Sequence, residues 1–85
     1  MIPQYLRPFF WDVNFDNFKP LSYPKYTISR ILERGDRQAV AWMSQTFSEE
    51  QISEVVRTDR GLSRKSANFW ALVYSIPSEE VAALQ

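Results

Sequence analysis

The residues with the clearest potential for chemistry are cations gathered in one short stretch. Between positions 57 and 65 four cationic side chains stand against one acid, Asp59, in a chain whose 10 Lys and Arg residues balance 10 Asp and Glu residues. A predicted helix precedes this stretch, Gly61 gives it a bend, and a second predicted helix begins at Ser63. This order resembles a helix-turn-helix, whose second helix meets DNA phosphates and base edges. The candidate nucleic-acid-binding residues are Arg57, Arg60, Arg64, Lys65 and Asn68.

The same pattern has a simpler interpretation as two neighbouring helices of a bundle. The bend spans about five residues, which is longer than the three or four of a typical helix-turn-helix. Each cation that contacts a phosphate adds salt-dependent affinity through counterion release, but the rest of the chain offers no matching excess of positive charge. DNA binding is therefore the alternative prediction and not the main one.

Catalytic and metal-binding side chains are poorly represented. The chain has no histidine and no cysteine, which removes the usual zinc ligands, the commonest acid–base catalyst near neutral pH and a thiol nucleophile. Glu50 and Glu54 lie four residues apart, but without a third ligand they are better interpreted as a solvated helix face. The alternation of Asp12, Asn14 and Asp16 lacks the glycine and the distal glutamate of a calcium loop. We predict a non-enzymatic protein without a metal or a cofactor.

Residues 1–21 are rich in aromatic side chains and interrupted by Pro3, Pro8 and Pro20. Prolines at such intervals block a long helix, and the rings follow neither a helical nor a strand period. We expect an arm laid across a helical body. Its rings either fill grooves in the protein's own core or form a docking surface, because exposed aromatic residues are typical interface anchors. Trp42 lies at the edge of a predicted buried stripe. It is either a residue at the rim of the core or a surface anchor for a partner. The candidate partner-binding residues are Phe10, Trp11 and Trp42.

Helix signals fill the rest of the chain. Asp36, Ser48 and Ser63 are placed to cap helices, with Gln51 completing a capping box, and Gly35 is placed as a residue that ends one. The predicted helices cover residues 23–34, 37–45, 49–57, 62–76 and 79–84. No strand signal is present. The sequence thus predicts an all-α protein: one domain over residues 1–85, a small bundle of four to five short helices in a body at 22–85, with a proline-punctuated aromatic arm at 1–21.

The stretch 62–76 is predicted to be the central helix. Its main apolar strip, at the spacing i, i+3, i+4 and i+7, consists of Phe69, Leu72, Val73 and Ile76. A second strip beside it consists of Ala67, Trp70, Ala71 and Tyr74. A helix that is apolar over more than half of its circumference should be buried on most sides.

The helix predicted at 23–34 has a more ordinary pattern. Its buried stripe should consist of Ile28, Ile31 and Leu32. We interpret its polar face, with Lys25, Ser29, Arg30, Glu33 and Arg34, as solvated surface.

Bulk properties indicate a cytoplasmic protein that does not enter a membrane. A net charge of zero argues against long-range attraction to nucleic acid or to anionic lipid. The first residues show neither the basic start nor the apolar run of a secretory signal. The longest uninterrupted apolar run, residues 69–74, is far shorter than a membrane span.

Three runs of the sequence, FFWDV at 9–13, ISRILERGD at 28–36 and LSRKSANFWAL at 62–72, resemble in order and spacing a family of small uncharacterised bacterial proteins. Those proteins typically show a Phe-Trp-Asp entry, a Leu-Glu-Arg-Gly-Asp centre and a Leu-Ser-x-Lys-x-x-Asn-Phe-Trp close. The family is a domain of unknown function. Its members are often encoded beside nucleotidyltransferase-like toxins of the abortive-infection type, so the resemblance implies an antitoxin or accessory role.

The residues of these runs also suggest contacts. We expect Trp11 and Asp12 to tie the arm to the body, with the Asp12 carboxylate accepting a hydrogen bond from Arg30, Arg34 or a helix N-terminus. Asn68, as a polar residue on a mostly buried helix, must either find partners or reach the surface, and we expect a structural hydrogen bond to the bend or to the arm.

Our main hypothesis is a non-enzymatic interaction module whose partner is another protein, the product of a neighbouring toxin-like gene. DNA is the alternative partner, and a homodimer is left open.

Overall fold

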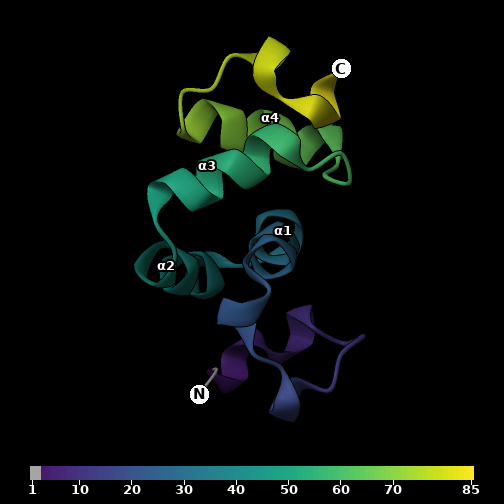
Figure 1. Cartoon of the computed structure of the whole chain (residues 1–85), viewed down its shortest axis with the longest axis vertical. Coiled ribbons are helices and arrows are strands. Elements are labelled where there is room, and N and C mark those ends of the chain that lie inside the picture. Colours follow the sequence, from purple (N-terminus) through teal and green to yellow (C-terminus); the bar gives the residue numbers. More distant parts are fainter. Residues whose placement is uncertain (1–2) are drawn as a thin grey trace.

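Helix α1, Pro24–Arg34, lies at the middle of the molecule in the computed structural model, which describes residues 3–85 (Figure 1). It contacts the arm and the three other long helices, which are α2 (Arg37–Thr46), α3 (Glu49–Thr58) and α4 (Arg64–Val73). The described residues contain helices and turns but no strand, so the predicted all-α class is confirmed. The predicted buried stripe of α1 is confirmed as well, and consists of Ile28, Ile31 and Leu32 together with Thr27.

The arm packs beneath α1 and α2, at the bottom of Figure 1. It contains three short 3-10 turns, η1 (Gln4–Phe9), η2 (Phe15–Asn17) and η3 (Pro20–Ser22). The core side chains that it supplies are Leu6, Phe10 and Phe15. These three side chains therefore fill the protein's own core, while Tyr5, Trp11 and Leu21 stay exposed. Residues 1 and 2 of the predicted arm lie outside the described residues.

Local capping chemistry sets the starts of α2 and α3. The Asp36 carboxylate accepts a hydrogen bond from the Ala39 N–H group at 2.9 Å. At α3, the Gln51 N–H group donates to Ser48 Oγ at 3.1 Å, and the Ser48 N–H group donates to Gln51 Oε1 at 3.0 Å. Both predicted starts are confirmed, because these side chains satisfy N–H groups that have no partner within the helix. The helices end at Thr46 and Thr58, close to the predicted ends.

Gly35 ends α1 for a different reason from the one that the sequence suggested. A glycine after a helix usually adopts a positive φ, but Gly35 is extended, with φ −68° and ψ 151°. What requires glycine here is space. A Cβ atom at this position would lie 2.6 Å from the carbonyl oxygen of Ile31 and 2.8 Å from its Cγ2 atom. The close approach of the chain to α1 therefore excludes a side chain.

Helix α4 is not the central helix, and this prediction is wrong. Its main predicted strip faces outward: Phe69 is 56% exposed, Leu72 81% and Val73 50%. The second strip is the buried one, with Ala67, Trp70 and Ala71 packed toward α1 and α3. Two alanines on this side allow the helix backbones to approach closely, which larger side chains would prevent. The Trp70 Nε1–H group, in addition, donates to the carbonyl oxygen of Leu32 at 2.8 Å and ties α4 to α1.

Helix α4 ends in a turn that the sequence did not predict. Ser75 has a positive φ of 56°, its N–H group donates to the Leu72 carbonyl at 3.3 Å, and the Ile76 N–H group donates to the Ala71 carbonyl at 2.8 Å. These two bonds form a Schellman motif, in which glycine is the usual residue at the position of Ser75. The motif turns the buried Ile76 back onto the core.

The predicted last helix at 79–84 is two 3-10 turns, η4 (Ser78–Glu80) and η5 (Ala82–Leu84). Val81 separates them in an extended conformation, and its side chain is fully buried. Burying that side chain breaks the helix.

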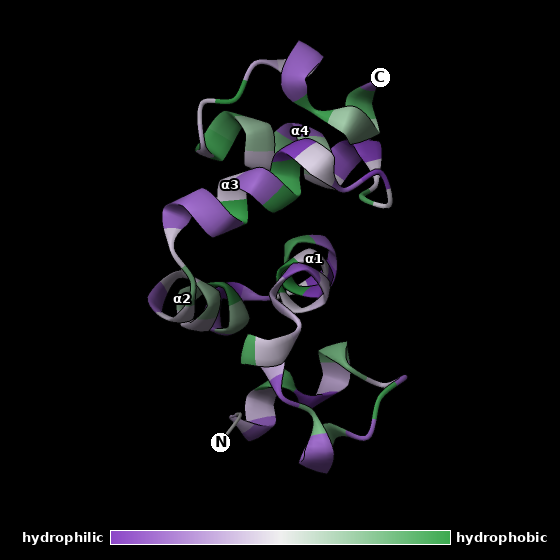
Figure 2. Ribbon diagram, in the orientation of Figure 1, coloured by the Kyte–Doolittle hydropathy of each residue, from purple (hydrophilic) through white to green (hydrophobic). Residues whose placement is uncertain are grey.

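Hydrophilic and hydrophobic residues alternate along the helices, as expected where each helix has one buried side (Figure 2). The buried apolar side chains form one cluster that extends from Leu6 to Val81. Over residues 3–85 none of the helices combines the length and the apolar character that crossing a membrane requires.

Candidate interaction site

A cleft of about 680 Å³ lies along the solvent side of α1, between the arm and the turn that joins α3 to α4. We call it the α1 cleft. Its larger apolar and aromatic walls are Trp11, Tyr23, Tyr26 and Leu62. Its charged residues are Lys25, Arg30, Glu33, Arg34 and Asp59. The cleft is thus bordered by segments from the start, the middle and the later part of the chain, and α1 holds them together.

Arg30 connects α1 to the arm. Its guanidinium group donates to Asp12 Oδ2 at 2.7 Å, to the Tyr26 hydroxyl at 2.7 Å and to the Phe9 carbonyl at 3.3 Å. The Tyr26 hydroxyl in turn donates to Asp12 Oδ1 at 2.7 Å. The Arg30 side chain is only 15% exposed, so its interpretation as solvated surface is wrong. The expected hydrogen bond from Arg30 to Asp12 is confirmed.

These contacts fix the protonation of the groups involved. The hydrogen bonds from Arg30 and then Tyr26 lower the pKa of Asp12 to about 2, so the carboxylate is charged at neutral pH. Burial, followed by the hydrogen bond to Asp12, raises the pKa of Tyr26. The phenol therefore remains a protonated donor over the physiological range.

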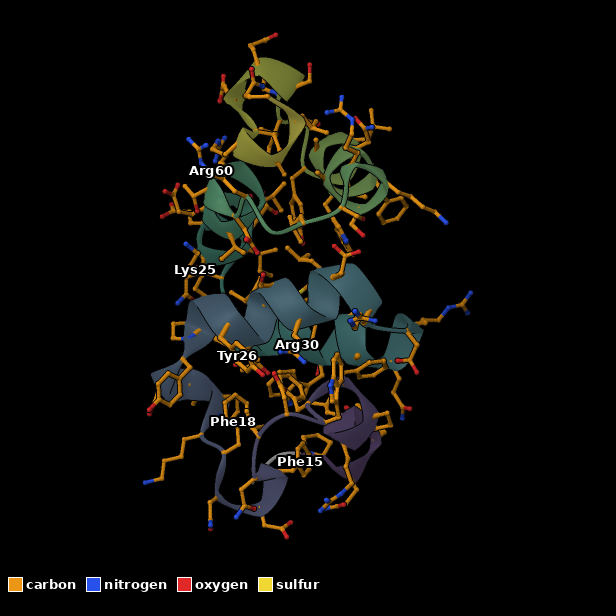
Figure 3. All side chains as sticks on the ribbon, turned by 90° about the vertical axis from the view of Figure 1, so that its right-hand side faces the viewer. Phe15, Phe18, Lys25, Tyr26, Arg30 and Arg60 are labelled. Atoms are coloured by element: carbon orange, nitrogen blue, oxygen red, sulfur yellow. The ribbon has the colours of Figure 1, made fainter. Side chains whose placement is uncertain are left out.

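Trp11 is held in place but left open to solvent. The guanidinium carbon of Arg30 lies 4.5 Å from the centre of the indole ring, and that of Arg34 lies 5.0 Å from it. Such cation–π contacts attract a cation to the face of the ring. The side of α1 that carries Tyr26 and Arg30 is turned toward the arm, where Phe15 and Phe18 lie (Figure 3). Even so, Trp11 remains 61% exposed.

The other edge of the α1 cleft is fixed by two carboxylates. Glu33 accepts hydrogen bonds from the Ser63 N–H group at 2.7 Å and from the hydroxyls of Ser63 and Ser66, each at 2.9 Å. Burial acts to raise the pKa of Glu33, but the hydrogen bonds from Ser63 and Ser66 outweigh it and lower the pKa overall. An anion at this place also suits the positive end of the α4 dipole.

Asp59 plays a similar part in the turn itself. Its carboxylate accepts a hydrogen bond from the Ser29 hydroxyl on α1 and another from the Gly61 N–H group at 2.8 Å. The turn between α3 and α4 is therefore anchored to the same helix as the arm.

The predicted partner-binding residues do not form one surface. Phe10 is 1% exposed and packs against Phe18 with ring centres 5.1 Å apart, so its prediction as a docking residue is wrong. Trp11 borders the α1 cleft. Trp42 is partly buried against the core and borders a second hollow of about 640 Å³ with Phe15, Phe18 and Leu21.

The predicted nucleic-acid-binding residues lie outside the α1 cleft. Arg57 is half-buried and pairs with Glu80, with 3.4 Å between Nε and Oε1. The exposed members of the set are Arg60, Arg64, Lys65 and Asn68. Asn68 reaches the surface, which is the second of the two alternatives that the sequence left for it.

Sequence reasoning missed several residues of the cleft. Tyr23, Tyr26, Arg30 and Arg34 recur every three or four residues and so share one face of α1. That spacing was visible in the sequence. The spacing does not show which part of this face the arm covers, so the arginines read as solvated surface and the two tyrosines carry no signal of a site.

Residues 5–56, more than half of the chain, match a family of unknown function, DUF6922. The chain belongs to this family. The DUF6922 match includes Trp11 and all of the α1 residues that line the α1 cleft. It stops before Asp59 and α4, so the motif at 62–72 lies outside the matched residues. No curated protein and no solved structure matches the chain.

Proposed function

We propose that this DUF6922 protein is a non-enzymatic bacterial interaction module, the antitoxin-like partner of a nucleotidyltransferase-type toxin encoded beside it. The antitoxin role rests on the resemblance of the runs at 9–13, 28–36 and 62–72 to proteins encoded beside such toxins. The observation that supports binding to a protein is the exposed Trp11 ring, held by two arginines at the edge of the α1 cleft.

The residue types in the cleft are those that dominate protein interfaces. Binding energy at interfaces concentrates in a few residues, and Trp, Tyr and Arg are the types most enriched among them. The α1 cleft brings together Trp11, Tyr23, Tyr26, Arg30 and Arg34. Tyr23 is 60% exposed, so two large rings are accessible to a partner.

The cleft is also arranged before a partner arrives. Ordering a flexible side chain at an interface costs about 0.5–1.5 kcal/mol, and a side chain that is already fixed avoids much of this cost. Trp11 is fixed by Arg30 and Arg34, and Arg30 is itself fixed by Asp12. A partner that inserts an apolar or acidic segment beside Trp11 would therefore meet a preformed surface. We propose that the module acts by covering the surface of the toxin that carries this segment.

The proposal is tested by co-expressing the chain with the product of the adjacent gene and measuring their co-purification. Replacing Trp11 or Arg34 with alanine should lower the recovered partner at least tenfold, since removing one interface anchor costs about 2 kcal/mol or more. Leu21→Ala is the matched control. Leu21 is 68% exposed but borders the second hollow, so its loss should leave recovery unchanged.

The pattern of outcomes also separates the two hollows. Loss of binding with Leu21→Ala or Trp42→Ala, but not with Trp11→Ala, would move the partner to the hollow beside α2. Full binding by all of these variants, with unchanged circular dichroism, would contradict the proposal.

DNA binding by α3 and α4 is the second candidate, supported by the exposure of Arg60, Arg64, Lys65 and Asn68. Two observations count against it. The first-turn donors of α4, which would meet a phosphate in a helix-turn-helix, already bind the Glu33 carboxylate, and Arg57 is paired with Glu80. If the regulator hypothesis holds, mobility shifts on the gene's own promoter should disappear in an Arg64→Ala, Lys65→Ala variant. The interaction hypothesis expects this variant to bind the partner normally.

A further inference from the structure

Helix α4 carries an apolar strip on its solvent face that is separate from the α1 cleft. The strip consists of Phe69, Leu72 and Val73, each at least half exposed, at the spacing i, i+3 and i+4. Single exposed apolar residues are ordinary, but three neighbours on one helical face form a contiguous patch of the kind that marks an interaction site. This face lies beyond the DUF6922 match.

The first turn of α4 carries charge of the sign that the helix dipole disfavours. Arg64 and Lys65 are exposed in the first turn, which contains no acid, and the last turn contains no base. Both features are the reverse of what the helix dipole favours. Tyr74, which follows the C-terminal end and packs on the core, shares a hollow with Glu49, Glu50, Glu54 and Arg57 of α3, away from the outward strip. The outward face therefore runs from a basic end through the apolar strip to the negative end of the helix dipole. Figure 2 shows α4 changing from hydrophilic at its N-terminus to hydrophobic at its C-terminus.

We propose that this face binds a second copy of the chain, with the two α4 helices antiparallel about a two-fold axis near Phe69. Contacts about such an axis use the same patch on both copies, so the patch must complement itself. With Phe69 at the axis, Lys65 and Val73 lie about 6 Å to either side along the helix, because each residue advances about 1.5 Å. Lys65 of one copy then faces Val73 of the other.

In this arrangement the exposed cations of each copy lie near the negative end of the partner's helix dipole. The cations Arg64 and Lys65 meet the negative end of the partner's α4, while the apolar strips cover one another. The zero net charge of the chain means that no overall repulsion opposes the approach of two copies. The contact is small. A face of one 10-residue helix offers less than the roughly 800 Å² per partner of a standard interface. We therefore expect a reversible dimer whose population depends on concentration.

Analytical ultracentrifugation across a range of concentrations tests the dimer. The wild-type mass should rise from one chain toward two, and Leu72→Glu should remain monomeric throughout. Leu72 is 81% exposed, so this change should not disturb folding, which circular dichroism checks. Leu21→Glu, at a leucine that is 68% exposed in the arm, is the matched control and should dimerise like the wild type. Lys65→Glu should weaken the dimer roughly fivefold at low salt and less at high salt.

Cysteine pairing tests the antiparallel geometry without background, because the chain has no native cysteine. Under mild oxidation Phe69→Cys should cross-link with itself, since a disulfide needs Cα atoms about 4.4–6.8 Å apart. Lys65→Cys and Val73→Cys should each stay monomeric alone but should cross-link when mixed. Leu21→Cys reports the level of random collisions.

A chain that stays monomeric at millimolar concentration would overturn the proposal, as would a dimer that persists in Leu72→Glu. Self-linking of Lys65→Cys and of Val73→Cys would overturn the antiparallel arrangement, because it indicates parallel helices. These results are independent of the α1 cleft, so the dimer and the proposed function can fail separately.

Discussion

Helices α1 and α4 look alike in sequence and are used in opposite ways. Each is about three turns long and has an apolar stripe at helical spacing. Helix α1 buries its large aliphatic residues, with Ile28 and Ile31 fully buried, and its polar face holds the arm and the turn. Helix α4 buries two alanines and Trp70, and exposes its large aliphatic residues.

The difference follows from the neighbours of each helix. Elements contact α1 from several sides: the arm and α2, then α3 and α4. Helix α4 packs against α1, α3 and the last 3-10 turn, all of which meet its alanine-bearing side. The place of a helix among the other elements therefore decides which of its apolar strips is buried. The hydropathy of the helix itself shows which strips could be buried, but not which of them is.

The largest expected effect tests this contrast directly. Ile31→Ala should lower the free energy of unfolding by about 2–5 kcal/mol, because it leaves a cavity in a fully packed place. Leu72→Ala should change it by less than about 0.5 kcal/mol, although the sequence placed both residues on buried stripes. Urea unfolding at a concentration low enough to keep the chain monomeric measures both, as a shift in midpoint at constant slope. Similar losses for the two variants would show that α4 is covered on its outer face.

The ends of the two helices give a second contrast, with opposite signs. Gly35→Ala should destabilise the protein by about 1–3 kcal/mol, because the new Cβ atom would overlap the Ile31 carbonyl at the end of α1. Ser75→Gly should stabilise it by about 0.5–1 kcal/mol, because a positive φ costs a serine more than a glycine. The same unfolding titrations measure both changes.

A control for these substitutions is Gly61→Ala. A Cβ atom at Gly61 would meet only the Asp59 Oδ1 atom, at 3.2 Å, and no backbone atom. It should therefore cost less than Gly35→Ala. If Gly61→Ala costs as much as Gly35→Ala, close approach is not what selects glycine at position 35.

The parts of the fold that were predictable depend on residues close together in sequence. Asp36 with Ala39, and Ser48 with Gln51, are three residues apart, so their capping bonds follow from the sequence alone. What could not be predicted depends on distant partners. Trp70 hydrogen-bonds to Leu32, and that contact helps to decide which strip of α4 faces inward. The pattern of residues 62–76 does not specify this contact with Leu32.

The contacts of the candidate site also fall into some that the sequence predicted and some that it did not. The hydrogen bond between Asp12 and Arg30 is one of the three that were expected for this carboxylate, the others being from Arg34 and from a helix N-terminus. The second arginine on Trp11 was not expected, and neither was the position of Glu33 at the start of α4. Both depend on where the arm and the turn cross α1, which the spacing along α1 does not specify.

The smallest expected effect concerns the polar face of α1, and its pH dependence separates it from a packing effect. Because the folded pKa of Asp12, about 2, lies below its ordinary value of 3.8, its ion pair adds stability above about pH 3.8. That contribution should disappear as the pH falls through about 2. Asp12→Asn should therefore be less stable than the wild type at pH 7 and equally stable below pH 2. Nuclear magnetic resonance of the carboxyl group should give a titration midpoint near 2.

The matched control for this measurement is Asp16→Asn, which removes an ion pair between Asp16 and Arg7 at 2.8 Å. Those side chains are 72% and 51% exposed, whereas the Arg30 side chain is 15% exposed. Solvent screens exposed pairs, so Asp16→Asn should have little effect at any pH. An equal effect of both variants, or an Asp12 midpoint near 4, would mean that the arm is held to α1 by its aromatic rings alone. Trp11 would then lack the preformed support on which the proposed interaction depends.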